Sequence, residues 1–254
     1  LLESNSYIDK VIPLQNSFSA FIKELKKEKY DFIIDLHSNL RTKRVKLALR
    51  TKSSSFDKLN YTKWKLVKLK KNHLPDIHIV DRYLETVQKL GVKNDKEGLD
   101  YFIPAGQEYK KDLPINYEVY AIGGQHATKQ LPMNRIIEYC KKQEAPIILL
   151  GGKEDINIGE LIENACPKVT SLCGKTSLGN SASIIKYSKK VHTHDTGMMH
   201  IAAAFNKPIV SIWGNTVPEF GMYPYYKDQE EPVGSKILEV KGLSCRPCSK
   251  IGFN

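Results

Sequence analysis

Short apolar runs alternate with amphipathic stretches in the first part of the chain. The continuous apolar run of residues 31–36 (DFIIDL) is typical of a strand buried on both faces of a parallel sheet. Apolar residues at helical spacing predict helices over residues 17–29 and 38–50, with Ser38 as the N-cap of the second helix. Residues 9–14 (DKVIPL) predict a further short strand.

A third helix pattern, over residues 76–91, ends at Gly91, a residue that readily adopts the left-handed conformation of a C-cap. The alternation then breaks over residues 99–118, which contain two prolines and no sustained periodicity. We place a linker there, which divides the chain into residues 1–107 and residues 108–254.

From residue 118 onward, strand and helix patterns alternate again. Their spacing is typical of βαβ units, in which parallel strands are joined by right-handed helical crossovers. The expected elements cover residues 118–124, 132–143, 146–152, 157–165, 170–174, 180–188, 190–195, 197–205 and 208–214. The whole pattern predicts an α/β protein with two Rossmann-like domains, whose parallel sheets face a cleft.

The composition is that of a globular protein. Of the 254 residues, 41% are apolar and 26% are charged. No apolar run approaches the length of a membrane-spanning helix. We expect both ends of the protein to be missing from this sequence, because it begins at Leu1 without a methionine and stops at Asn254, shortly after a cysteine pair.

The net charge of +11 comes from one basic segment. Residues 41–71 contain twelve Lys and Arg residues and one acidic residue, Asp57. Such a segment is either a solvated face or a surface that attracts a polyanion, such as nucleic acid, an anionic lipid or a phosphorylated substrate. Tyr61, Trp64 and several leucines lie among the lysines, a mixture that suits a membrane interface at least as well as nucleic acid. No nucleic-acid-binding motif accompanies it.

Two of the five cysteines, Cys245 and Cys248, have the spacing of metal ligands. A structural zinc site needs four ligands, so this pair is half of a zinc site, or the two residues form a disulfide. The other three cysteines lie in apolar or helical surroundings and are predicted to be reduced: Cys140, Cys166 and Cys173.

Unusual polar residues follow three of the expected strands, at the sheet edge where open parallel sheets bind their ligands. The first place is residues 122–132 (IGGQHATKQLP), where two glycines allow a ligand to approach the backbone. Thr128 and Lys129 precede a helix there. A lysine beside a helix N-terminus supplies both the positive charge and the free N–H groups that bind a diphosphate.

The second place is residues 149–155 (LLGGKED), where Glu154 and Asp155 follow a strand and a Gly-Gly turn. An acidic side chain at this position can bind a ribose hydroxyl. From the residues alone, we favour a simpler interpretation, in which both acids stabilise a helix N-terminus through the helix dipole.

The third place is the turn between a strand and a small-residue helix in residues 189–214. Asp195, Thr196 and Gly197 fill this turn, and His200 lies one helical turn later. The helix N-terminus can bind phosphate oxygens, Asp195 can orient sugar hydroxyls and His200 can donate a hydrogen bond. Alternatively, Asp195 is only the N-cap of the helix and His200 is an ordinary core residue.

A zinc hydrolase is a further alternative, because His192 and His194 alternate on the strand that precedes Asp195. The spacing differs from the H-x-H-x-D-H pattern of binuclear hydrolases, since Asp195 directly follows His194. The chain contains no Asp-x-Asp pair, the carboxylates with which many nucleotide-sugar enzymes hold a divalent cation.

Together these stretches resemble the ADP-heptose:lipopolysaccharide heptosyltransferases of glycosyltransferase family nine. The most specific part of the resemblance is the block DTGMMHIAAA followed by KPIVSIWG. The resemblance covers most of the chain, in residues 30–44, 123–132, 149–155, 171–216 and 245–250. It implies two Rossmann-like domains of GT-B type, a nucleotide-sugar bound mainly by the C-terminal domain, and inversion at the anomeric carbon without a metal.

The resemblance also implies which residues bind the donor, ADP-heptose. Thr128 and Lys129 would neutralise the departing diphosphate, and Glu154 would contact the ribose. The sugar and diphosphate would be held by Asp195, Thr196, Gly197 and His200.

For the acceptor, the resemblance implies an anionic, lipid-linked saccharide of the lipopolysaccharide core, facing Arg41 and Lys43. It implies a cytoplasmic protein at the inner face of the inner membrane, and no nucleic-acid partner. In the family the catalytic base follows the very first strand, so we expect the base to lie upstream of Leu1. The competing interpretations are another GT-B transferase or an epimerase with a different nucleotide-sugar, and a non-catalytic polyanion-binding protein.

Overall fold

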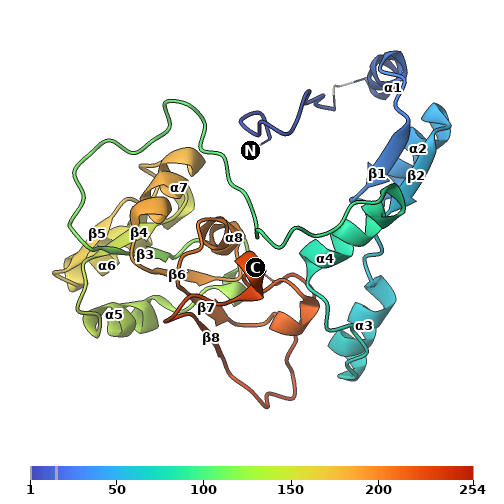
Figure 1. Ribbon diagram of the computed structural model, residues 1–254. Helices are drawn as coiled ribbons and strands as arrows, with labels where there is room; N and C mark the ends of the chain where they lie inside the picture. The colour runs from blue at the N-terminus through green and yellow to red at the C-terminus, as the bar shows by residue number, and fades with distance from the viewer. Residues whose placement is uncertain (1, 15–16, 254) are drawn as a thin grey trace.

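The computed structural model describes residues 2–14 and 17–253, which form an α/β structure with two parallel sheets (Figure 1). The smaller sheet pairs β1 (Phe32–Asp35) with β2 (Lys52–Ser55). This architecture confirms the predicted fold class. The six strands of the larger sheet are β3 (Glu118–Ala121), β4 (Ile147–Leu150), β5 (Val169–Ser171), β6 (Val191–His194), β7 (Ile209–Trp213) and β8 (Lys236–Glu239).

Helices surround the smaller sheet and connect it to the rest of the chain. Helix α4 (Ile79–Leu84) continues into the 3-10 helix η1 (Glu85–Leu90), which ends at Gly91 with a φ of 80°, as predicted for a C-cap. None of the helices in the described residues is long and apolar enough to span a bilayer. The helices of this part are α1 (Phe18–Lys27), α2 (Leu40–Leu49), α3 (Asn60–Leu69) and α4 (Ile79–Leu84).

Helix α2 begins one residue later than its predicted cap implies. Its N-cap is Asn39, whose side chain accepts the Thr42 N–H at 2.9 Å, while the Thr42 hydroxyl accepts the Asn39 N–H at 3.0 Å. Ser38 instead has a left-handed φ of 44° and lies outside the helix. The predicted cap at Ser38 is therefore wrong, because Asn39 and Thr42 form a reciprocal capping box.

Three elements of the N-terminal part differ from the sequence prediction. Residues 9–14 have irregular backbone and form no strand, and Pro13 lacks the N–H that a strand ladder uses. The strand β2 (KSSS) has no apolar residue to reveal it. Helix α3 (NYTKWKLVKL) mixes aromatic and basic residues without the apolar spacing of an ordinary amphipathic helix.

The order of the strands in the larger sheet is β5-β4-β3-β6-β7-β8, and every pair is parallel. The chain therefore proceeds from β3 toward one edge and from β6 toward the other. The carboxyl ends of β3 and β6 flank the crevice at this topological switch point, where such sheets bind ligands. The connecting helices are α5 (Met133–Lys141), α6 (Ile156–Ala165), α7 (Leu178–Tyr187) and α8 (Gly197–Ala204).

The helices cover both faces of the larger sheet, with α5 and α6 on one face and α7 and α8 on the other (Figure 1). Consecutive residues of β3 show this arrangement, since side chains alternate along a strand. Val119 belongs to the apolar cluster that contains Ile185 of α7, whereas Tyr120 belongs to the cluster that contains Ile162 of α6. Burial on both faces explains why these strands appear as continuous apolar runs.

Residues 91–117 contain no helix or strand, and part of this segment is fixed against α7. The Asn180 side chain donates to the Gln107 carbonyl at 2.8 Å, and the Tyr109 N–H donates to the Ser183 hydroxyl at 3.1 Å. The segment thus packs against α7 of the C-terminal half before it enters β3. The domain boundary between residues 107 and 108 stays a prediction.

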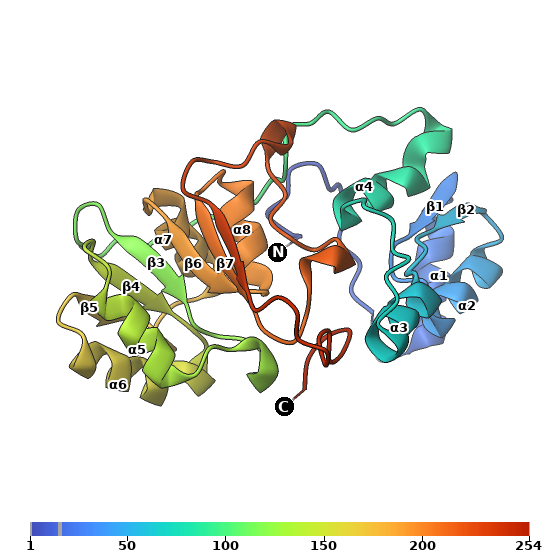
Figure 2. The same ribbon diagram turned by 90° about the horizontal axis from the view of Figure 1, so that it is seen from below.

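The N-terminal part contacts the C-terminal half through α3 and α4, which lie beside the segment after β7 (Figure 2). Leu66 of α3 packs with Val217 and Phe220 in one apolar cluster. The Ile79 N–H, at the start of α4, donates to the Gly221 carbonyl at 2.8 Å. These contacts hold the smaller sheet to one side of the crevice.

Helix α6 provides a test of the packing beneath the larger sheet. Ile162 is fully buried, whereas the adjacent Leu161 is 53% exposed. Ile162→Ala should lower the free energy of unfolding by about 2–5 kcal/mol, because it removes buried carbon atoms and leaves a cavity. Leu161→Ala should change it by no more than about 0.5 kcal/mol. Urea unfolding measures both, and equal effects would contradict the packing described here.

Candidate functional site

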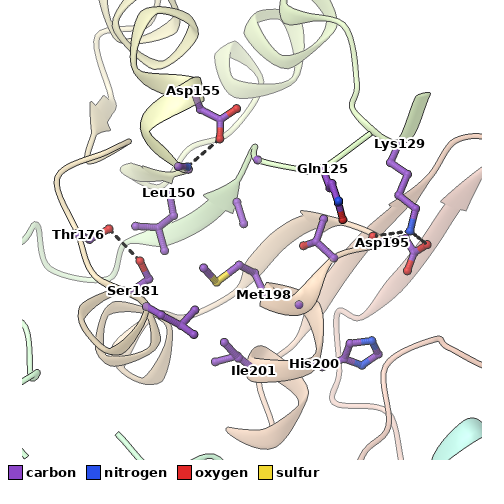
Figure 3. Close-up of a pocket in the computed structure, with 18 of the residues that line it drawn as sticks. Gln125, Lys129, Leu150, Asp155, Thr176, Ser181, Asp195, Met198, His200 and Ile201 are labelled. Carbon is purple, nitrogen blue, oxygen red and sulfur yellow. Dashed lines mark hydrogen bonds and ion pairs between the residues drawn. The ribbon is translucent and has the colours of Figure 1, made fainter. Parts of the chain in front are cut away.

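A cavity of about 880 Å³ lies at the switch point, beyond the carboxyl ends of β3, β4 and β6 (Figure 3). Its volume is in the range of small-molecule binding sites. Glycines after β3 and β4 form one side of the cavity, and the first turns of α8 form the other. Six of the seven predicted donor-site residues line it: Lys129, Glu154, Asp195, Thr196, Gly197 and His200.

Lys129 and Asp195 form an ion pair at the edge of this cavity (Figure 3). The Lys129 Nζ lies 2.7 Å from the Asp195 Oδ2 and donates also to the Asp195 carbonyl at 3.2 Å. The Thr216 hydroxyl donates to the same Oδ2 at 2.9 Å. Because both side chains are largely buried, these bonds hold the ammonium group in one place.

The N-terminus of α8 opens into the cavity without a side-chain cap. Thr196 is the N-cap residue, in extended backbone, and its side chain makes no capping hydrogen bond. Apart from its chain neighbours and the backbone of its own helix, a Cβ built on Gly197 would meet no atom within 4 Å, so no other part of the protein fills the space beside the first helical turn. The alternative in which Asp195 caps this helix is therefore wrong. Uncapped N–H groups at a helix N-terminus favour an anion.

His200 lines the cavity from the first turns of α8. Burial lowers the pKa of His200 below its ordinary value of 6.5, Asp195 raises it and Lys129 lowers it further. The imidazole is therefore neutral at neutral pH and has one N–H to donate. His200 is therefore a residue of the cavity and not only of the core.

Asp155 explains the lack of a side chain at Gly123, one of the two glycines predicted to allow close ligand approach, and at Gly151 in the second Gly-Gly turn. Its side chain is 3% exposed, and its Oδ2 accepts the Gly152 N–H at 2.8 Å. A Cβ on Gly123 would come within 2.7 Å of that Oδ2, and a Cβ on Gly151 within 2.8 Å of the Asp155 Cβ. The missing side chains at Gly123 and Gly151 thus make room for Asp155. Burial raises the pKa of Asp155, while the Gly152 N–H opposes this effect.

Glu154, the predicted ribose contact, lies at the exposed rim of the cavity. Its carboxylate lies over Gly152, where a Cβ would collide with it. The neighbouring Asp155 also lines the cavity, but its carboxylate is bound to the Gly152 N–H. Glu154 is therefore the acid of this pair that is free to meet a hydroxyl.

Thr128 does not line the cavity. Its hydroxyl accepts the Phe253 N–H at 2.8 Å and donates to the Phe253 carbonyl at 3.0 Å. The Thr128 side chain thus binds the segment after β8, on the outside of the loop that carries Lys129. Thr128 and Lys129 are adjacent in sequence, and their spacing alone does not reveal that only Lys129 faces the cavity.

Arg41 and Lys43, the predicted acceptor contacts, lie on α2 in the N-terminal part. Both side chains are exposed, and neither lines the cavity. Figure 1 shows α2 on the opposite side of the molecule from the larger sheet.

The apolar end of the cavity is not predicted by the sequence pattern. Leu99 and Tyr101 come from the segment that we treated as a linker, and Leu178 and Ile201 come from α7 and α8. A hydroxyl pair lies beside them, formed by Thr176 and Ser181 with 2.9 Å between their oxygens (Figure 3). The aromatic side chain of Tyr101, in an otherwise irregular segment, is the signal that could have indicated this end of the cavity.

The two strand histidines bind protein groups. The His192 Nε2 lies 2.6 Å from the Glu118 Oε2, and its Nδ1 lies 2.8 Å from the Tyr139 hydroxyl. The His194 Nε2 accepts the Leu131 N–H at 2.9 Å. These bonds occupy both ring nitrogens of His192 and the Nε2 of His194, and so leave a zinc hydrolase at this strand without two free histidine ligands.

Cys245 and Cys248 are both exposed and both carry free thiols. In the described part of the chain, no group of three or more His, Cys, Asp or Glu side chains is arranged to hold a metal ion. The structure therefore adds no further ligand to the cysteine pair. Cys140, Cys166 and Cys173 are buried free thiols, as predicted.

The family model described as glycosyltransferase family 9 (heptosyltransferase) matches residues 18–248. The chain belongs to glycosyltransferase family 9. Lipooligosaccharide heptosyltransferase 2 of Haemophilus influenzae is 34% identical to this family member over 91 residues, which are 34% of this chain and 26% of that protein. The matched segment thus spans about a quarter of this relative.

Two solved structures resemble this family 9 chain in fold. The ADP-heptose LPS heptosyltransferase II of Escherichia coli superimposes with a TM-score of 0.68 at 17% identity, over 95% of this chain and 78% of that one. The E. coli heptosyltransferase WaaC with ADP gives a TM-score of 0.59 at 21% identity, over 83% and 68% of the two chains. The fold is therefore that of the GT-B heptosyltransferases.

His194 makes this family member sensitive to mild acid. Burial lowers the pKa of His194 from 6.5 to about 4, so the folded chain keeps the ring neutral while the unfolded chain takes up a proton. The free energy of unfolding should therefore fall as the pH drops from 6.5 to about 4, by about 3 kcal/mol for this residue alone, and no further below that range.

His194→Gln, whose side-chain oxygen can accept the Leu131 N–H, should flatten this pH dependence. Urea unfolding of the wild type and the variant, at neutral pH and near the lower end of that range, measures the difference. His73→Gln, at an exposed histidine, is the matched control and should leave the pH dependence unchanged. A His194→Gln profile parallel to that of the wild type would contradict the neutral, buried state of the ring.

Proposed function

We propose that this chain binds ADP-heptose and takes part in the transfer of its heptose to a lipopolysaccharide core acceptor, with inversion and without a metal. One observation carries the proposal: the Lys129–Asp195 ion pair lies in front of the uncapped N-terminus of α8, at the mouth of a cavity large enough for a nucleotide-sugar. The family membership makes a heptose donor the first choice.

The ion pair and the helix N-terminus fit the needs of the leaving group. When the bond between sugar and diphosphate breaks, its electron pair stays on the diphosphate, where negative charge develops. The Lys129 ammonium and the first N–H groups of α8 would stabilise that charge in place of a divalent cation. Because Asp195 holds the ammonium beforehand, little reorganisation is needed when the charge appears.

The rest of the cavity suits the nucleoside of the donor. The apolar end formed by Tyr101, Leu178 and Ile201 would cover a flat purine ring, with the Thr176 and Ser181 hydroxyls beside it. Glu154 at the rim would accept a hydrogen bond from a ribose hydroxyl, and His200 would donate one to the sugar or the diphosphate.

For the acceptor, we propose Arg41 and Lys43 of α2 as contacts for its phosphates, because both side chains are exposed cations. An acceptor of this kind is embedded in a membrane, so we also propose a cytoplasmic protein at the inner face of the inner membrane. The transfer also needs a general base to take the proton of the acceptor hydroxyl, and we assign that role to no residue of the described chain.

Calorimetric titration with ADP, UDP and GDP, each with and without EDTA, tests the proposal. ADP should bind at one saturable site, with an affinity that EDTA does not change. UDP and GDP should bind at least about tenfold more weakly, a difference that one or two lost base contacts account for.

Each other outcome of this titration contradicts a definite part of the proposal. A preference for UDP or GDP would be compatible with the GT-B fold but would contradict ADP-heptose as the donor, as expected of another GT-B transferase or an epimerase. Loss of ADP binding in EDTA would contradict a metal-free site. No nucleotide binding together with strong, salt-sensitive binding of a random oligonucleotide would favour the polyanion-binding protein.

A further inference from the structure

Helix α3 has two faces of different character. Residues 63, 66, 67 and 70 share one face, because residues three and four positions apart are neighbours on a helix. This face contacts the C-terminal half: Leu66 packs with Val217 and Phe220, and the Lys63 Nζ lies 5.8 Å from the centre of the Phe220 ring. The opposite face of α3 is turned away from these contacts.

Two aromatic and two basic residues form that outer face, at the same helical spacing. We call Tyr61, Trp64, Lys65 and Lys68 the α3 face. Tyr61 is 67% exposed and Trp64 is 44% exposed. Their rings are stacked at 6.1 Å with an angle of 10°, and the Lys65 Nζ lies 4.6 Å from the centre of the Tyr61 ring. The two rings therefore form one continuous aromatic surface that is exposed to solvent.

The α3 face carries only positive charge. The sequence of α3 contains no Asp or Glu. Among the ion pairs of the described residues, none includes Lys65 or Lys68. The helix also lies within the segment 41–71, which has twelve basic residues and one acidic residue. A partner that covers this face must therefore supply negative charge and also accept two aromatic rings.

We propose that the α3 face docks on the surface of an anionic lipid bilayer. Tyrosine and tryptophan side chains settle at the level of the lipid headgroups, and lysine stems extend so that their ammonium groups meet the phosphates. Anionic lipids attract each such lysine. The inference deepens the proposed function, on which it rests for its purpose, since docking would bring the transferase to a lipid-linked acceptor.

The arrangement of the rings favours a bilayer over nucleic acid. Proteins that bind single strands present free aromatic faces on which bases stack. The Tyr61 ring already has Trp64 stacked beside it and the Lys65 ammonium over it. The rings thus offer a compact apolar surface with charge around it, which is what a headgroup region accommodates.

Sedimentation with lipid vesicles tests the charge of this face. The full chain should sediment with vesicles of equal parts phosphatidylcholine and phosphatidylglycerol, and not with phosphatidylcholine alone. The double variant Lys65→Gln/Lys68→Gln should lower the partition coefficient roughly thirty-fold, the effect of two lost lysine contacts. The matched control is Lys186→Gln/Tyr187→Ser on α7, where an exposed tyrosine also lies beside a lysine, and it should bind as the wild type does.

Tryptophan fluorescence tests the aromatic part, because the chain has two tryptophans in different surroundings. Trp64 is exposed, whereas Trp213 is buried and donates to the Ser211 hydroxyl at 3.0 Å. Anionic vesicles should shift the emission to shorter wavelength. Trp64→Phe should abolish this shift and Trp213→Phe should preserve it.

Several outcomes would overturn the proposal: no vesicle binding, unchanged binding of the double lysine variant, or no shift from Trp64. Binding of a random oligonucleotide that depends on Lys65 and Lys68, without vesicle binding, would assign the face to nucleic acid instead. ADP titration of the same variants separates this inference from the proposed function, because the α3 face lies outside the cavity and its substitutions should leave ADP affinity unchanged.

Discussion

The ion pair between Lys129 and Asp195 is the interaction on which the candidate donor site depends. Its two residues are 66 positions apart in the chain and meet only because β3 and β6 are neighbours in the sheet. The pair also lies where α8 begins, so one ammonium group and the uncapped N–H groups of a helix face the same space. The proposed diphosphate site is thus a consequence of the strand order.

Packing around Asp155 keeps the opposite side of the same cavity open. The carboxylate is bound to the Gly152 N–H and fills the space beside Gly123 and Gly151. The two Gly-Gly turns after β3 and β4 therefore lie close together and leave the rim to Glu154. Gly123 and Gly151 are therefore needed for the packing of Asp155, and the two turns that contain them line the cavity.

The sequence predicted the elements from β3 to β7 well, because strands buried on both faces are continuous apolar runs, but it did not predict the exposed strand β8. It failed where this signal is absent, as in the polar strand β2 and in α3. The site residues were found as neighbours in sequence, yet the structure separates Thr128 from Lys129. The packing role of Asp155 is visible only in the structure, because the glycines beside it follow two different strands, β3 and β4. Long-range pairing is not visible in local patterns.

The affinity of Gly197→Ala for ADP tests the account most directly. Apart from the chain neighbours of Gly197 and the backbone of its own helix, no protein atom lies within 4 Å of the added Cβ, so the variant should unfold at the same urea concentration as the wild type, or a slightly higher one. If the diphosphate lies against the first turn of α8, the methyl group takes its place and ADP should bind at least about tenfold more weakly. Unchanged ADP affinity in a folded variant would contradict a diphosphate at this helix N-terminus.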